Sequence, residues 1–212
     1  MTDLNSSAPW AKLTIETALR DGTPVRMRPV QPDDRHLLEV GMDHLSGESR
    51  YFRFFSPVSK LSESMLCRFT EIDHVDHEAV GALDIGTPPG TPIGTPIGTP
   101  IGVARYIRLP EQEFAAEVAL TVADSHQGRG LGTLMLAYLV QRATDNGISE
   151  FTALVLRDNH RMRDVFRELG ASVKRAGAGE VNIGIPLFAD PAQYPQMPVG
   201  DVFRRHCQRD GT

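Results

Sequence analysis

The chain has 212 residues, of which 41% are apolar and 23% charged, and its formal net charge is −5 at pH 7. This length suits one domain with a sizeable core. The acidic balance offers no basic face for duplex DNA, so we expect no nucleic-acid partner. No apolar run approaches the ~20 residues of a membrane span, and the N-terminus lacks a signal-like pattern. We therefore expect a cytoplasmic protein with no membrane partner.

The cysteine content is low. Cys67 and Cys207 lie far apart and in no metal-ligand spacing. Neither a disulfide framework nor a metal site is predicted from them, and two reduced thiols fit a cytoplasmic protein.

The first part of the chain predicts a short lead-in, a strand and two helices. Residues 1–13 are small and polar and indicate a flexible lead-in. Apolar and basic residues alternate over 25–30, which predicts a strand. Pro32-Asp33-Asp34 predicts the start of a helix that ends near 45–47, because acidic side chains favour the positive end of the helix dipole. Helical spacing predicts a second helix over 63–72.

The most aromatic stretch is residues 49–56, Ser-Arg-Tyr-Phe-Arg-Phe-Phe-Ser. Aromatic rings that alternate with arginine can stack RNA bases. The alternative is a connecting loop whose rings pack onto the core. The lack of a wider basic patch favours the loop.

A repeat separates two predicted strands at 79–85 and 102–109. Gly-Thr-Pro-Ile occurs three times over 90–101, after a degenerate copy at 86–89. Proline at every fourth residue removes backbone donors and blocks a helix. We therefore expect residues 86–102 to form an extended, exposed insert in a hairpin. Either a partner-binding arm or a tolerated tandem duplication at a loop tip explains it.

The second half predicts alternating strands and helices. A strand over 115–122 leads through a glycine-rich loop into a long helix over 131–146, which stops at Asn146-Gly147. An apolar strand at 151–156, a helix that ends at Gly170, and a strand pair at 172–174 and 181–185 follow. Residues 189–212 form a tail. This order predicts an α+β fold, a mixed α/β layer with helices on both faces of one sheet.

The loop from His126 to Thr133 has glycine at every second position from 128 to 132. Such glycines let the backbone approach a ligand and turn its N–H groups outward. The helix N-terminus adds its dipole and Arg129 adds charge, so the loop predicts an anion site suited to a diphosphate. The lysine of a Walker loop and the glycine spacing of a dinucleotide fingerprint are both missing. A tight strand-to-helix turn without a ligand is the alternative.

Three motifs in order resemble those of the GNAT acetyltransferase superfamily, over about residues 14–188. Gln127, Gly130 and Gly132 match the family's Gln-x-x-Gly-x-Gly/Ala after the strand Leu120-Thr121-Val122. Asn159 followed by Phe166 and Leu169-Gly170 is similar to a later motif, and residues 25–34 are similar to the first strand and helix. The resemblance implies a GNAT-like fold with a central, mostly antiparallel sheet and helices on both faces.

The resemblance also implies acetyl-CoA as co-substrate, with no metal. The backbone of Leu120, Thr121 and Val122 would pair with the pantetheine arm, and Asn159 would contact the CoA arm. The diphosphate would lie on the loop formed by Gln127, Gly128, Arg129, Gly130, Leu131, Gly132 and Thr133.

A narrower resemblance, carried by residues 19–24, 45–46 and 49–56, is to the acetyltransferase domain of bacterial protein-lysine acetyltransferases. Those proteins often carry an additional large domain or a cyclic-nucleotide-binding domain. This chain has room for neither, so regulation by such a domain is not expected.

Glu117 is the predicted catalytic base. A lysine ammonium, whose pKa is about 10.4 in water, must lose a proton before it attacks a thioester. Glu117 interrupts an apolar strand ten residues before Gln127, and lysine-modifying members of the family place a glutamate similarly. Partial burial would make it a stronger base. A salt-bridged edge glutamate is the alternative, His126 is a second candidate base, and Glu111 and Glu113 are expected to be solvated.

The general acid is not assigned, because many GNAT enzymes have a tyrosine where this chain has Phe166. Backbone N–H groups near Val122 would polarise the thioester carbonyl. The predicted acceptor is a primary amine, foremost a protein lysine. A small amine and an acyl-CoA-binding module without turnover are the alternatives, and a monomer or weak homodimer is expected.

Overall fold

The computed structural model describes residues 13–86, 98–177, 179–196, 200 and 202. Its centre is an open sheet of eight strands in the order β1-β2-β3-β4-β5-β6-β8-β7. Neighbouring strands are antiparallel except for β5 and β6. No helix among the described residues is long and apolar enough to cross a bilayer.

The strands are β1 (Ile15–Ala18), β2 (Pro24–Pro29), β3 (His77–Asp84), β4 (Thr99–Leu109), β5 (Gln112–Val122), β6 (Glu150–Leu156), β7 (Ser172–Ala176) and β8 (Glu180–Pro186). The helices are α1 (Arg35–Asp43), α2 (Gly47–Phe54), α3 (Glu63–Thr70), α4 (Leu131–Asp145) and α5 (His160–Glu168). Short 3-10 turns are η2 (Pro32–Asp34), η3 (Asp124–His126) and η4 (Pro191–Gln193).

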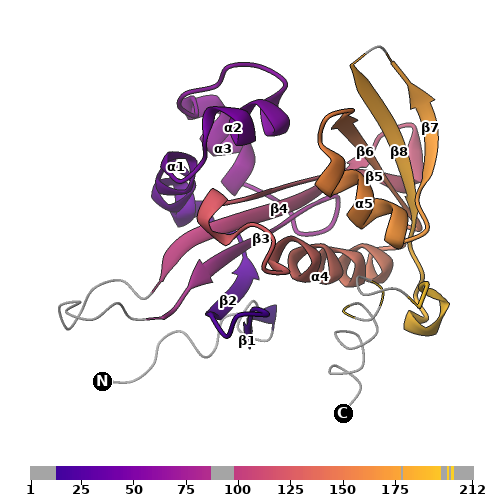
Figure 1. Cartoon of the computed structure of the whole chain (residues 1–212), viewed down its shortest axis with the longest axis horizontal. Coiled ribbons are helices and arrows are strands. Elements are labelled where there is room, and N and C mark those ends of the chain that lie inside the picture. The colour runs from indigo at the N-terminus through magenta and orange to yellow at the C-terminus, as the bar shows by residue number, and fades with distance from the viewer. Residues whose placement is uncertain (1–12, 87–97, 178, 197–199, 201, 203–212) are drawn as a thin grey trace.

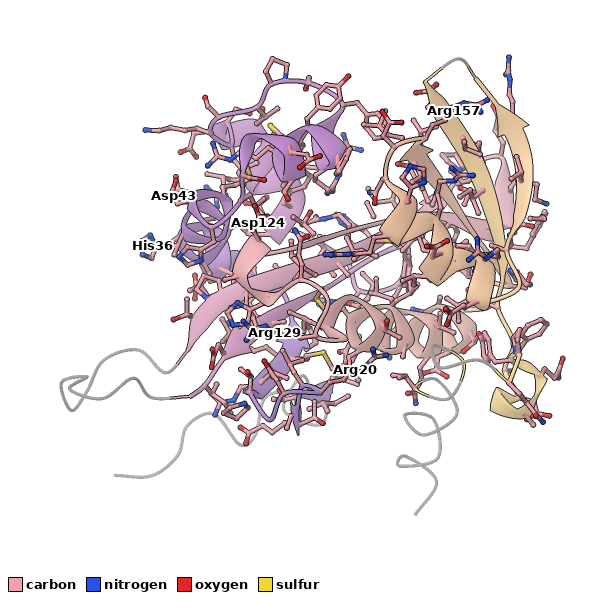
Figure 2. All side chains as sticks on the ribbon, viewed as in Figure 1. Arg20, His36, Asp43, Asp124, Arg129 and Arg157 are labelled. Carbon is pink, nitrogen blue, oxygen red and sulfur yellow. The ribbon has the colours of Figure 1, made fainter. Side chains whose placement is uncertain are left out.

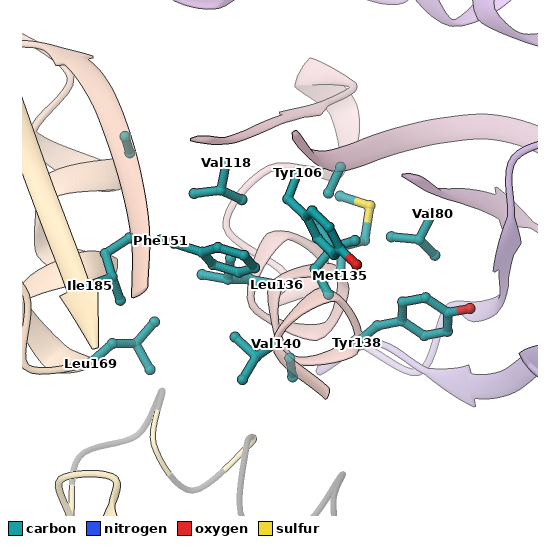
Figure 3. Packing of buried hydrophobic residues seen from close by; sticks show 14 of the residues in the cluster. Val80, Tyr106, Val118, Met135, Leu136, Tyr138, Val140, Phe151, Leu169 and Ile185 are labelled. Carbon is teal, nitrogen blue, oxygen red and sulfur yellow. The ribbon is translucent and has the colours of Figure 1, made fainter. Parts of the chain in front are cut away.

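Helices cover both faces of the sheet, as predicted. Tyr106 of β4 and Val118 of β5 pack with α4 in the core (Figure 3). Arg105, the neighbour of Tyr106 in the strand, instead reaches Phe69 of α3. Because adjacent strand residues point to opposite faces, α3 lies across the sheet from α4. Figure 1 shows α1, α2 and α3 grouped together, away from α4. The predicted mostly antiparallel sheet is confirmed.

Two elements differ from the prediction. The aromatic segment predicted as a connecting loop is largely helical, because Ser46 Oγ accepts the N–H of Ser49 at 3.1 Å and caps α2. That helix ends where Phe55 adopts the left-handed conformation, with φ 54°. Strand β1 was not predicted, since its four residues are too short for a periodic signal.

The repeat lies in the hairpin that the sequence predicts. Asp84 at the end of β3 pairs with Thr99 at the start of β4. Most of the repeat falls within 87–97, which lies outside the described residues. The predicted lead-in at 1–12 also lies outside them. Residues 99–102, predicted as part of the insert, instead belong to β4.

The first residues of the predicted tail dock on the core. Tyr194 is 2% exposed, and its ring meets Phe188 edge to face at 5.1 Å between centroids. Its hydroxyl accepts the backbone N–H of Phe188 at 3.1 Å. This contact holds the first residues of the predicted tail against the core.

A buried ionic cluster ties α4 to the sheet. Glu78 of β3 is fully buried, and its carboxylate accepts a hydrogen bond from Arg142 Nε at 3.0 Å. The second oxygen of Glu78 lies 2.8 Å from His74 Nδ1. A buried carboxylate needs such partners, because an unpaired charge in the interior costs several kcal/mol. Because Arg142 lies near the end of α4, the cluster fixes the C-terminal half of this helix against β3.

Candidate active site

Strands β5 and β6 separate at one end of the sheet. Their parallel pairing covers three positions and ends at Glu117 opposite Thr152. Beyond that point β5 continues to Val122 and β6 to Leu156. The other edge of Leu120–Val122 pairs with β4, so the edge towards β6 has no strand partner in the described part of the chain. An extended ligand can pair with such an edge.

The predicted anion loop adopts the geometry that its glycines allow. Gly128 and Gly130 have φ of 77° and 94°, in the left-handed region that disfavours side chains. A Cβ on Gly132 would come within 3.3 Å of Leu120 Cδ1, so glycine lets α4 lie close to β5. Leu131 and Thr133 are buried, at 1% and 6% exposure. These two residues can therefore serve a ligand through their backbone N–H groups, which have no acceptor within the helix.

The side chain of Gln127 braces this loop. Its Nε2 donates to the carbonyl of Val122 at 3.2 Å and to Ser49 Oγ at 3.1 Å. Its Oε1 accepts from Arg161 of α5 at 2.9 Å. The sequence predicted Gln127 as a ligand contact. The structure shows a side chain with hydrogen-bond partners on three elements, and its contact with a ligand stays a prediction.

Asp124 anchors the same region to α2. The carboxylate of Asp124 accepts two hydrogen bonds from α2 and its cap. Ser49 Oγ donates one at 2.6 Å, and the backbone N–H of Ser46 donates the other at 3.1 Å. Burial alone would raise the pKa of Asp124, but these hydrogen bonds outweigh it and lower the pKa. Figure 2 shows Asp124 between the α1–α3 group and the loop. The start of α2 is thus fastened to the end of β5.

The turn between β1 and β2 supplies a second arginine to the loop. Arg129 forms an ion pair with Asp21 at 2.8 Å, and the backbone N–H of Arg20 donates to the carbonyl of Arg129 at 3.2 Å. Arg20 Nε lies 3.4 Å from the place a Cβ would take on Gly130. Figure 2 shows Arg20 and Arg129 near the N-terminal end of α4. Sequence reasoning missed Arg20 because it missed β1; the turn triplet Arg20-Asp21-Gly22 was the available signal.

Asn159 lies where β6 passes into α5. Its Oδ1 accepts the backbone N–H of Met162 at 3.2 Å and caps the helix. The amide N–H groups of Asn159 have no hydrogen-bond partner among the described residues and are free for a ligand. Phe166, about two turns further along α5, is 2% exposed and packs in the core. It fills space and cannot donate a proton.

Glu117 occupies the last paired position before the strands separate. Its neighbour Val118 faces α4, so Glu117 projects from the opposite face. The side chain is exposed rather than partly buried. The expected partial burial of Glu117 was therefore wrong, and its role as the base stays a prediction. Burial lowers the pKa of Arg53, and the negative charge of Glu117 partly offsets this effect, which places the two charges near each other.

The other candidate bases lie elsewhere. His126 Nε2 is 3.3 Å from Asp84 Oδ2, and its Nδ1 is 2.9 Å from Ser125 Oγ, so both ring nitrogens are engaged. Glu111 and Glu113 are exposed, as expected for solvated carboxylates. In the described part of the chain, no group of three or more histidine, cysteine, aspartate or glutamate side chains is placed to hold a metal ion.

An open strand edge that leads into a glycine loop at a helix N-terminus suits a long, phosphate-bearing ligand of the acyl-CoA type. Residues 59–171 match the model of the acetyltransferase (GNAT) family. The chain therefore belongs to this family, and the predicted fold and enzyme class are confirmed.

Individual relatives agree with the family. The chain is 35% identical over 167 residues to acetyltransferase Pat of Mycolicibacterium smegmatis, which covers 79% of this chain and 47% of Pat. It is 30% identical over 153 residues to acetyltransferase PA5475 of Pseudomonas aeruginosa, which covers 72% of this chain and 77% of that protein. The GNAT domain of S. lividans PAT superposes with a TM-score of 0.73 at 34% identity, over 84% of this chain and 98% of that domain. The chain spans about half the length of Pat.

Proposed function

We propose that this chain transfers the acetyl group of acetyl-CoA to a primary amine, foremost the side chain of a protein lysine. The observation that carries the proposal is the position of Glu117, at the point where the open edge of β5 begins. Acetyl-CoA would supply an activated thioester there. We place the reaction in the cytoplasm, in keeping with the free thiol of Cys67.

The described residues fit a CoA molecule. Gly128 has open space where a Cβ would stand, so its backbone is accessible to a diphosphate. The first-turn N–H groups of α4, with Arg20 and Arg129 beside them, would hold the negative charge. From Glu117 to Val122 the strand edge runs about 17 Å, at ~3.3 Å per residue, which suits an extended arm. Asn159, at the start of α5, would contact this arm.

Glu117 would accept a proton from the incoming ammonium, directly or through one water, because a protonated amine has no lone pair for attack. Its exposure lets the acceptor reach it without a conformational change of the sheet. The N–H groups on the open edge of Leu120–Val122 are the available donors to a carbonyl oxygen in which negative charge develops. Phe166 supplies no acid, so the departing thiolate takes its proton from solvent or leaves as the anion.

The exposed setting of Glu117 favours a protein acceptor. A small amine gains its affinity from an enclosing pocket, whereas a lysine on a protein surface brings its own contact area and needs only an accessible base. The similarity to Pat and to the S. lividans PAT domain points the same way. A small-amine acceptor is the second candidate.

The test is to incubate the protein with acetyl-CoA and a cell lysate and to map new acetyl-lysines, with Glu117→Gln in parallel. Glu111→Gln is the matched control, since it removes the same charge from an exposed site. We expect new acetyl-lysines with wild type and Glu111→Gln but not with Glu117→Gln.

A panel of small amines, followed by release of the CoA thiol, separates the two acceptor classes. Release only with small amines would overturn the lysine proposal. Tight binding of acetyl-CoA without transfer to any acceptor would overturn the enzymatic function and favour a binding module.

A further inference from the structure

A cavity of about 80 Å³ lies on the face of the sheet opposite α4. Helices α1, α2 and α3 roof it, and strands β2 to β5 form its floor. Most of its wall is apolar, with Leu37, Leu38, Met42 and Val103 among the residues that line it. The glycine loop does not line this cavity, whereas Thr121 of the open strand edge and Arg53 near Glu117 do, so the cavity adjoins the proposed site of acetyl transfer.

The charged groups in its wall do not balance. Arg28 and Asp34 pair through two hydrogen bonds of 2.6 and 2.7 Å and neutralise each other. Arg53 and Arg105 also line the cavity, and neither forms an ion pair with any described residue. Glu117, beyond the cavity wall, is the carboxylate that acts on Arg53. The cavity therefore carries excess positive charge.

Arg105 is the more enclosed of the two, at 4% exposure. Its Nη1 donates to the carbonyl of Phe69 and to His77 Nε2, both at 3.3 Å, and the guanidinium lies 4.1 Å from the centre of the Phe69 ring. No carboxylate forms an ion pair with Arg105 among the described residues. A buried cation without a counter-ion is costly, which favours an anionic ligand.

The charge states of Arg105 and His77 at neutral pH keep the cavity positive. Burial, with help from Arg53 and Arg68, lowers the pKa of Arg105 to about 9, so the guanidinium still carries its charge at pH 7. Burial and the charge of Arg105 lower the pKa of His77 to about 4, so this imidazole is neutral at pH 7 and leaves the positive charge in excess.

We propose that this cavity binds a small monocarboxylate, whose carboxylate pairs with Arg105 and Arg53 and whose short aliphatic chain lies among the apolar residues of α1 and β4. Planar guanidinium groups suit a carboxylate, which can accept two parallel hydrogen bonds. The volume limits the ligand to a few heavy atoms, since a single water already needs about 10–15 Å³. Acetate, propionate and butyrate are of this size.

The experiment titrates sodium butyrate into the full chain and follows binding by calorimetry and by amide NMR shifts, at constant ionic strength set with sodium chloride. We expect saturable binding with shifts at residues that line the cavity, such as Leu38 and Val103. Butylamine, of similar size and opposite charge, should not bind. Shifts spread over the surface, or equal binding of chloride, would overturn the proposal.

Two variants test the site by different means. Arg105→Gln removes the charge and should weaken butyrate binding at least tenfold. Gly41→Leu leaves Arg105 intact and fills the cavity from α1, where a Cβ would meet only Pro100 Cβ at 3.9 Å. It should abolish binding. Lys60→Gln, an exposed change before α3, is the control that should bind butyrate like wild type.

The two variants test the proposal independently, so one of them still tests it if the other fails to fold. Butyrate binding that survives in Gly41→Leu would overturn the proposal on its own. Binding of an acidic peptide but not of butyrate would assign the two arginines to a protein partner instead.

Discussion

The glycine loop can be tested with two substitutions that impose the same backbone strain at opposite ends of α4. Gly128 has φ 77° and Gly147 has φ 78°, and neither has an atom within 4 Å of a Cβ placed on it. Alanine at either position is therefore free of clashes but costs about 1–2 kcal/mol if the left-handed conformation is kept. The two variants differ in location alone.

Gly128→Ala should weaken acetyl-CoA binding, because its loop must either keep the strain or leave the conformation that presents its N–H groups. A cost of about 1–2 kcal/mol corresponds to a rise of about 5- to 30-fold in Kd. Gly147→Ala, beyond the C-terminus of α4, should lose similar stability with an unchanged Kd. Calorimetry with acetyl-CoA and urea unfolding measure the two quantities. Equal Kd values for both variants would refute the assignment of the loop as the diphosphate site.

Three further changes test other parts of the account. Arg20→Gln should raise the KM for acetyl-CoA several-fold. Added salt should shrink the difference in KM from wild type, because salt screens exposed charges. An unchanged KM at low salt would show that Arg20 is not part of the site. Arg142→Met should cost about 3–5 kcal/mol in urea unfolding, since it leaves Glu78 buried without its cationic partner; a loss below about 1 kcal/mol would contradict this role. His77 has its pKa lowered to about 4 in the folded chain, so the unfolded chain binds its proton first, and stability should fall as pH drops from about 6.5 to 4. His77→Gln should flatten this fall in pH-dependent urea unfolding, and an unaltered slope would argue against a buried neutral imidazole.

Much of the fold follows from periodic patterns in the sequence. The long helix α4 and the strand β6 bury apolar residues at the expected spacing, and both were predicted within a residue or two of their observed bounds. Strand β1 and helix α2 were not, for different reasons. Strand β1 is held by pairing with β2 rather than by its own pattern. Helix α2 depends on its Ser46 cap and on Asp124, which is distant in sequence.

The backbone geometry of the loop was predictable, but the contacts around it were not. Glycine spacing indicated the loop, because glycine adopts the conformation of Gly128 and Gly130 without strain. The hydrogen bonds of Gln127 were not predictable, since its partners Ser49 and Arg161 come from α2 and α5. The exposure of Glu117 depends on where β6 diverges from β5 and on how α2 packs beside β5. Such features depend on tertiary contacts that a single sequence does not reveal.

The central claim is that Glu117 removes the proton from the acceptor amine. The most direct measurement is the single-turnover rate of acetyl transfer by Glu117→Gln across a range of pH, with acetyl-CoA affinity measured alongside. The account predicts an unchanged affinity and a rate about 10²- to 10⁴-fold lower near neutral pH. The deficit should shrink as the pH approaches the pKa of the amine. An unchanged rate, or a deficit that is the same at every pH, would contradict it.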